Sequence, residues 1–161
     1  MSADRPGSDL PAAIGLGNEL VDAWASWGPT LDPHSQRVAF ISDRSGVPCV
    51  WVQEIPAPGQ RCEAERIHLS DDPVVSVNWS ADGGWLACCV ATGGGVRTQV
   101  WVVRPDGRQA RRVAGSAEQH AELGPWTRSG HRVVVSLPGE QAEEPTRSYL
   151  VDPIDGAKSA S

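Results

Sequence analysis

Short hydrophobic runs alternate with polar turn sequences along most of this chain. Three runs of small and β-branched residues, at 38–41, 86–90 and 133–135, each follow a turn rich in Pro, Asp, Ser or Gly. A polar, Gly-containing connection then leads to a second run centred on an aromatic residue, in the stretches CVWVQE, QVWVVR and SYLVD. Strands of about five residues between such turn formers are typical of an antiparallel meander. The pattern therefore predicts an all-β protein.

Aromatic residues recur along the chain with a period close to 50 residues. A leading set is spaced by 52 and 47 residues, and a second set by 50 and 48; the sets are Trp27, Trp79 and Trp126, and Trp51, Trp101 and Tyr149. A fourth strand of each unit is expected in the connecting stretches, at 66–70 and 110–115. Four short strands in a repeat of about 40–50 residues are typical of a β-propeller blade. We predict a partial β-propeller of about three four-stranded antiparallel blades, at about 24–70, 71–115 and 116–161.

The repeated residues have a structural interpretation. An aromatic side chain at a fixed blade position is expected to lie between adjacent blades, because no single blade can bury its own sheet faces. Asp82 and Gly83, in the turn SADGG, are expected to form a tight hairpin turn, since both residue types tolerate positive φ. The 23 residues before the repeats do not fit the pattern. They are predicted to be a leader, compatible with a short helix from Leu10 to Trp24.

Composition and charge exclude several classes of partner. The chain has 14 Lys and Arg against 20 Asp and Glu, for a net charge of −6. Nucleic acids and anionic membranes usually select a basic patch, so we expect neither as a partner. No apolar stretch approaches the roughly 18 residues of a membrane helix. The first 20 residues lack the basic and apolar regions of a signal peptide, so we expect a cytoplasmic protein.

The sequence presents no recognisable catalytic or metal site. The four cysteines form no C-x-x-C pair and have no histidine at a zinc-ligand offset, so we interpret them as small apolar residues. The sequence G-x-S-x-G, which places a hydrolase nucleophile on a strained turn, does not occur in these 161 residues. We therefore assign no catalytic, cofactor-binding or metal-binding residue and expect no cofactor.

The first repeat resembles a known propeller unit. The stretch LDPHSQRVAFISDRSGVPCVWVQE resembles the PD40 (TolB-type) repeat, usually a Ser-Pro-Asp-Gly turn, a small apolar strand, a Ser-Asp-Arg-x-Gly connection and an aromatic strand. Residues 42–46 keep that connection, whereas 32–35 depart from the turn. The second copy keeps the turn better, as SADG at 80–83. The whole is most similar to the N-terminal propellers of prolyl-oligopeptidase (S9) family serine peptidases.

This resemblance implies a propeller of about seven blades that caps an α/β-hydrolase domain with a Ser-Asp-His triad and restricts proteolysis to short peptides. The hydrolase motif is absent here, so this chain alone is not expected to be catalytic. The alternative is a TolB- or WD40-like module that binds a protein or peptide and has no enzymatic role.

Three blades cannot close a ring, because propellers have about 4–8 blades. We expect either a fragment of a longer propeller or a small protein that completes a ring as a homo-oligomer. The expected partners are a peptide or protein, or the missing blades and hydrolase domain.

Overall fold

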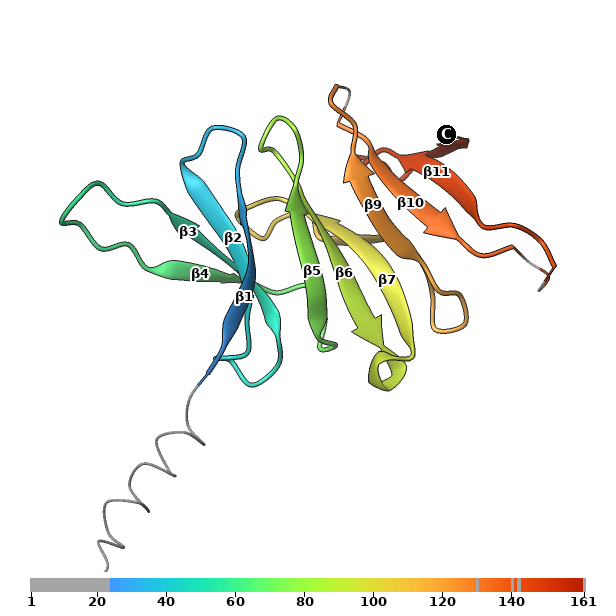
Figure 1. Ribbon diagram of the computed structural model, residues 1–161, viewed down its shortest axis with the longest axis horizontal. Helices are drawn as coiled ribbons and strands as arrows, with labels where there is room; N and C mark the ends of the chain where they lie inside the picture. Colours follow the sequence, from blue (N-terminus) through green and yellow to red (C-terminus); the bar gives the residue numbers. More distant parts are fainter. Residues whose placement is uncertain (1–23, 130, 140, 142, 161) are drawn as a thin grey trace, which may run out of the picture.

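The computed structural model of the chain describes residues 24–129, 131–139, 141 and 143–160. These residues form three four-stranded antiparallel sheets, which are arranged like a fan (Figure 1). The first sheet contains β1 (Ser26–Leu31), β2 (Arg37–Ser42), β3 (Cys49–Glu54) and β4 (Ala64–Ile67). The second contains β5 (Val74–Trp79), β6 (Leu86–Thr92), β7 (Arg97–Val103) and β8 (Arg111–Ala114), with a 3₁₀ turn at Gly93–Gly95. The third contains β9 (Glu122–Trp126), β10 (Val133–Leu137), β11 (Arg147–Val151) and β12 (Lys158–Ala160).

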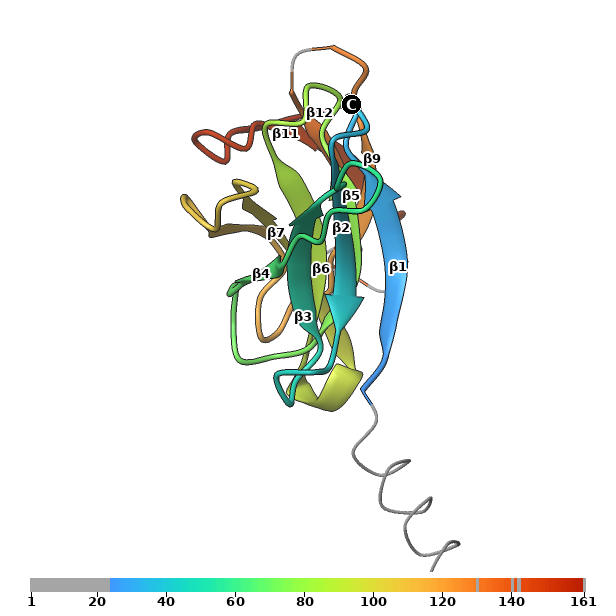
Figure 2. The same cartoon turned by 90° about the vertical axis from the view of Figure 1, so that its left-hand side faces the viewer.

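Each sheet is a meander in which consecutive strands are neighbours. Figure 2 shows the first sheet in front of the other two. The middle sheet is covered on both sides, and all seven residues of β6 are accordingly buried. A strand packed on both faces is expected to be apolar throughout rather than alternating, which explains the run LACCVA. The predicted fold class, an all-β partial propeller of three four-stranded sheets, is confirmed.

Two hydrophobic cores lie between the three sheets. The first core joins the first and second sheets through residues such as Ile41, Val50 and Leu86. The second joins the second and third sheets through residues such as Val100 and Val133. Side chains alternate between the two faces of a strand, so the middle sheet presents one set of residues to the first sheet and another to the third.

Strand register shows which residues are equivalent in the three sheets. Trp79 pairs with Leu86 and Trp126 with Val133, while the corresponding pair in the first sheet is Leu31 with Val38. Leu31 therefore holds the position that the sequence pattern assigned to Trp27, four residues earlier. The corrected steps are 48 and 47 residues. Trp27 pairs instead with Ile41, before an irregularity in β1 that extends to Thr30.

The second aromatic set keeps its register in every sheet. The β3, β7 and β11 aromatics pair with equivalent residues of the preceding strand, as Trp51 with Phe40, Trp101 with Cys88 and Tyr149 with Val135.

The fourth strand of the first sheet begins earlier than expected, at Ala64, and ends at Ile67. It ends there because the chain then crosses to the second sheet, where the Val74 N–H donates to the Pro48 carbonyl at 2.8 Å. The leader predicted for residues 1–23 lies outside the described residues.

Candidate functional site: the contacts between blades

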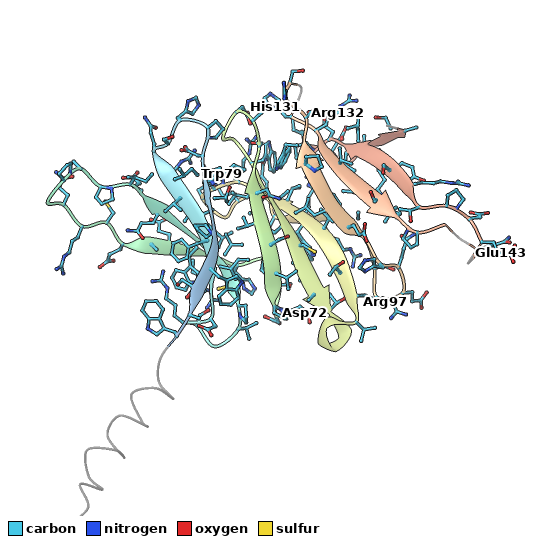
Figure 3. The ribbon with its side chains drawn as sticks, in the orientation of Figure 1. Asp72, Trp79, Arg97, His131, Arg132 and Glu143 are labelled. Atoms are coloured by element: carbon cyan, nitrogen blue, oxygen red, sulfur yellow. The ribbon has the colours of Figure 1, made fainter. Side chains whose placement is uncertain are left out.

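The same indole-to-carbonyl hydrogen bond joins both pairs of adjacent sheets. Trp79 Nε1 donates to the Thr30 carbonyl of β1 at 3.0 Å, and Trp126 Nε1 donates to the Asn78 carbonyl of β5 at 3.2 Å. Figure 3 shows Trp79 directed from β5 toward the first sheet. Each bond uses a carbonyl of the first strand of one sheet and the last residue of the first strand of the next. These bonds hold β1, β5 and β9 at fixed spacing along one edge of the molecule.

A shared geometry also appears in the turn after each of these strands. The side-chain oxygens of Asp32, Ser80 and Thr127 each accept a hydrogen bond from the backbone N–H five residues later, at 3.1, 2.9 and 3.1 Å. Each of the three residues also donates its own N–H to the carbonyl at that later position. Asp, Ser and Thr are suited to this role because their short side chains bond readily to nearby backbone. These three turns of one geometry follow β1, β5 and β9, which we call the inner strands. Together the turns form a rim at the end of these strands.

Arg37 crosses from the first sheet to the second at this rim. Its guanidinium carbon lies 4.8 Å from the centroid of the Trp79 ring, and its Nη2 donates to the Gly83 carbonyl at 3.1 Å. Its Nε lies 3.3 Å from Asp32 Oδ2. Burial alone would raise the pKa of Asp32, but hydrogen bonds from the Arg37 and Gln36 N–H groups and the charge of Arg37 lower it overall. The carboxylate is therefore held in its charged form, where it orients Arg37 over Trp79.

Asp82 and Gly83 lie in the turn between β5 and β6, and both contact a neighbouring sheet. Gly83 has φ +70°, and a Cβ there would lie 3.4 Å from Pro33 Cδ of the first sheet. Asp82 Oδ2 lies 3.0 Å from His131 Nδ1 of the third sheet, and Figure 3 shows His131 at this rim. The Asp82 Oδ1 atom accepts from the Ser80 hydroxyl at 2.6 Å and from the Gly84 N–H at 3.1 Å. The turn thus links all three sheets.

The remaining predicted positions differ in environment. Trp27 is 39% exposed on the first sheet, and Trp51 is half-buried with the Arg44 guanidinium 3.5 Å from its ring centroid. Trp101 is half-buried beside the first core and donates to Gln99 Oε1 at 3.2 Å. Tyr149 packs beside the second core.

Sequence reasoning missed Leu31, Asp32 and Arg37. Aligning the repeats on the turn residue after the first strand, rather than on the nearest Trp, would have found them.

One cluster of polar side chains lies outside the rim, where the chain passes from β8 to β9. Thr98 Oγ1 is 3.1 Å from His120 Nδ1, and His120 Nε2 is 3.8 Å from Glu122 Oε1. The Thr98 hydroxyl, however, donates to the Ala121 carbonyl at 2.6 Å, and Nδ1 faces the Thr98 N–H at 3.2 Å. With its proton directed to a carbonyl, this hydroxyl is not positioned for activation by the imidazole. The cluster instead fastens the β8–β9 connection to β7.

Neighbouring Cys89 has little nucleophilic character. Burial raises the pKa of its thiol, although hydrogen bonds with Thr98 and Ser76 oppose the rise. A protonated thiol is a poor nucleophile.

Among the described residues, no group of three or more His, Cys, Asp and Glu side chains is arranged to hold a metal ion. No helix in that part of the chain is long and hydrophobic enough to span a membrane.

Comparison with known structures defines the class of fold. The described architecture matches TolB from Agrobacterium tumefaciens with a TM-score of 0.60 and 21% identity, over 84% of this chain and 48% of that one. It matches the Pyrococcus horikoshii acylaminoacyl peptidase with a TM-score of 0.58 and 16% identity, over 84% of this chain and 24% of that one. It also matches the β-propeller domain of the Trilobed protease from Pyrococcus furiosus, with a TM-score of 0.56 and 12% identity, over 84% of this chain and 41% of that one. The fold is therefore that of a TolB-like β-propeller.

The sequence comparisons establish no family. No protein-family model matches the chain. A holo-[acyl-carrier-protein] synthase of Rhodopseudomonas palustris (strain BisA53) is 27% identical over 130 residues, which cover 77% of this chain and 82% of that protein. The chain spans about half of the Agrobacterium TolB structure and about a quarter of the acylaminoacyl peptidase structure.

Proposed function

We propose that this chain is a non-catalytic propeller segment of a prolyl-oligopeptidase-like serine peptidase, where it restricts which peptides reach a hydrolase domain. The observation that supports this proposal is the match of 84% of the chain to about a quarter of an acylaminoacyl peptidase. A segment of that relative size corresponds to a few blades rather than to a whole enzyme. The carbonyl-bound indoles and the rim turns supply the rigidity that a filter needs.

The inner edge of the molecule, formed by β1, β5 and β9, is the surface that a peptide would meet. Strands β1, β5 and β9 each stand at the edge of their sheet. An edge strand offers N–H and C=O groups that an extended peptide can bind along its main chain. The polar groups at the rim, including the half-exposed pair of Asp82 and His131, lie at the end of these strands. Main-chain binding of this kind tolerates many side chains and selects for an extended peptide.

A second candidate function is supported by the match to TolB. Nearly half of the Agrobacterium TolB structure is covered, at a TM-score of 0.60. In that case the propeller is a binding module for a protein or peptide and has no hydrolase partner. Both candidates assign the same rim and inner edge to the ligand, and they differ in whether a hydrolase domain is joined to the propeller.

The open reading frame after the codon for Ser161 separates the two candidates. The peptidase proposal expects further blades and then a G-x-S-x-G sequence. The protein encoded by that complete frame should hydrolyse a chromogenic acylaminoacyl or prolyl substrate, while the 161-residue chain should show no turnover above the blank. Further blades or a stop with no hydrolase would overturn the peptidase proposal and favour the binding module.

Gating has its own test in the full-length protein. Replacing Asp82 and His131 together by Ala removes the pair that links the second and third turns. If the rim restricts entry, hydrolysis of peptides longer than those normally accepted should increase relative to that of a short substrate. A matched control is the pair Asp106→Ala and Arg108→Ala, an exposed ion pair within the β7–β8 turn. Unchanged selectivity in the rim variant would contradict a gating role.

A further inference from the structure

The outer face of the first sheet carries aromatic side chains that no other sheet covers. The residues of β2 and β3 that face the second sheet are buried; they are Ala39, Ile41, Val50 and Val52. Because side chains alternate along a strand, Phe40 and Trp51 lie on the opposite face. Trp27 and Leu31 of β1 are exposed, and so is Trp24, which is 60% exposed.

An arginine with unused hydrogen-bond donors lies among these rings. The Arg44 guanidinium carbon is 3.5 Å from the centroid of the Trp51 ring, 5.7 Å from that of Trp24 and 5.8 Å from that of Phe40. Its Nε and Nη2 atoms are buried and have no hydrogen-bond partner among the described residues. The Oδ1 atom of the neighbouring Asp43 accepts instead from the Ala25 N–H at 2.7 Å. A buried charge without a partner is unfavourable, so these donors call for an acceptor.

The shape of this face matches a specific kind of occupant. A groove of about 350 Å³ is lined by Trp24, Trp27, Phe40, Arg44 and Gln53, among others. Aromatic walls around a guanidinium suit a carboxylate that is flanked by apolar side chains.

The exposed face of the third sheet differs in polarity from this outer face of the first sheet. In the third sheet, Ser136 pairs with Ser148, with their hydroxyls 3.0 Å apart. The equivalent pairs are Ile41 with Val50 and Cys89 with Val100, both buried against the next sheet. The exposed face of the third sheet is thus more polar than the corresponding faces of the other two sheets.

The face around Arg44 lacks one feature of the two blade contacts and is unfavourable for a second copy. Leu31 stands where the other sheets have Trp79 and Trp126, so this face lacks the indole donor used at both blade contacts. A two-fold contact centred on the groove would place Arg44 against its own copy, and like charges brought together cost affinity.

We propose that residues 10–23 of the same chain dock on this face, with the carboxylate of Glu19 or Asp22 paired to Arg44. Residues 1–23 end next to Trp24, at the groove itself. They contain four acidic residues and one Arg, and their apolar residues include Leu16 and Leu20. An acidic, leucine-containing segment that ends at the groove complements its charge and its apolar walls. A ring closed by further blades, as in the proposed function, would place another blade beside the first sheet, so the docking is proposed for the 161-residue chain.

Amide hydrogen exchange of the full chain, read by mass spectrometry, tests this docking. Exchange within residues 10–22 should be about tenfold slower than in a free peptide of the same sequence, as expected for a segment held by local contacts. Arg44→Gln should remove most of that protection. The matched control is Arg104→Gln, since Arg104 also stacks on a Trp, at 3.9 Å from Trp85, but already donates to the Gly84 carbonyl and to Gln109 Oε1. Amides of β6 report whether each variant remains folded.

Charge reversal then identifies the partner. Arg44→Glu should expose residues 10–22, and adding Asp22→Arg or Glu19→Arg should restore protection for the residue that pairs with Arg44. Wild-type exchange equal to that of the free peptide would overturn the proposal, as would an Arg44→Gln variant that keeps its protection. Protection of β1 and β2 that rises with protein concentration, together with a dimer in sedimentation, would also overturn it, because a second copy would then cover the face.

Discussion

The two contacts between blades share one backbone design but differ in how they are filled. Trp79 and Trp126 occupy the same register position and donate to equivalent carbonyls, at 3.0 and 3.2 Å. Trp79 is 8% exposed and carries Arg37 over its ring, whereas Trp126 is only partly buried beside the second core. The hydrogen bond therefore sets the spacing of the sheets, while the surrounding side chains determine how much apolar surface each contact buries.

The same contrast extends to the rest of each contact. In the first contact, between the first and second sheets, Arg37 donates to the Gly83 carbonyl and pairs with the buried Asp32 carboxylate. In the second contact, between the second and third sheets, the rim interaction is that of Asp82 with His131. Their side chains are 40% and 51% exposed. Because exposed ion pairs contribute little to stability, the first contact should be the stronger of the two.

The largest expected effect comes from removing the buried indole. Trp79→Ala should lower the free energy of unfolding by about 3–5 kcal/mol, because it leaves a cavity in the first core and an unpaired Thr30 carbonyl. Trp126→Ala should cost less, about 1–3 kcal/mol, in proportion to its smaller buried area. Urea denaturation followed by far-ultraviolet circular dichroism measures both.

Trp79→Phe is the control for the hydrogen bond, and it should cost about 1 kcal/mol for the bond in addition to the loss in ring size. The comparison between the two contacts would be wrong if Trp126→Ala proved as costly as Trp79→Ala.

A smaller effect is expected where the chain passes from the second sheet to the third. Gly115 has φ +81°, and a Cβ there would lie 2.9 Å from the Thr98 carbonyl oxygen and 3.0 Å from Gln99 Cα. Gly115→Ala should cost about 1–3 kcal/mol, since it combines an unfavourable φ with a contact to backbone that cannot move aside. The measurement is again the urea midpoint.

Gly46→Ala provides the matched control, because Gly46 also has positive φ, +97°, but nothing lies within 4 Å of its added Cβ. Its expected cost is about 1 kcal/mol, from the left-handed backbone alone. Equal losses for the two variants would show that the close approach at Gly115 contributes nothing to the second contact.

The architecture could be predicted from the sequence because it depends on local signals. Alternation of short apolar runs and turn formers fixes the strands, and the period of about 48 residues fixes the blades. The aromatic positions at Trp51, Trp101 and Tyr149 hold their register in all three sheets for the same reason.

The first repeat was misaligned because Trp27 is a stronger signal than Leu31, although the backbone gives the blade position to Leu31. Irregular pairing in β1 between Trp27 and Thr30 hides the offset from any count of residues. The cross-blade partners could not be predicted either. The contacts of Arg37 with Trp79 and of Asp82 with His131 join residues 42 and 49 positions apart, and only the packing of the sheets brings them together.

The smallest expected effect is a difference in pH dependence between the two rim carboxylates. Burial alone would raise the pKa of Asp82, but hydrogen bonds from Ser80 and Gly84 and the attraction of His131 lower it overall. A lowered pKa in the folded protein means that the charged carboxylate stabilises the fold above the ordinary Asp pKa of about 4, and that this stability is lost as the pH falls through the folded-state value. Asp82→Asn should therefore cost less than about 1 kcal/mol at pH 7, because the group is substantially exposed, and less still near pH 3.

Asp32→Asn sharpens the comparison, because Asp32 has the same direction of shift but is 2% exposed and holds Arg37 over Trp79. Its loss at pH 7 should exceed that of Asp82→Asn, and it should also shrink as the pH falls. Urea midpoints of the wild type and both variants between pH 3 and pH 7 give the two curves. His131→Ala separates the parts of the Asp82 effect: most of it should remain, since the Ser80 and Gly84 hydrogen bonds lie within one turn. If His131→Ala instead removed the entire pH-dependent difference, the ion pair would dominate the second contact, and the two contacts would both depend on charge.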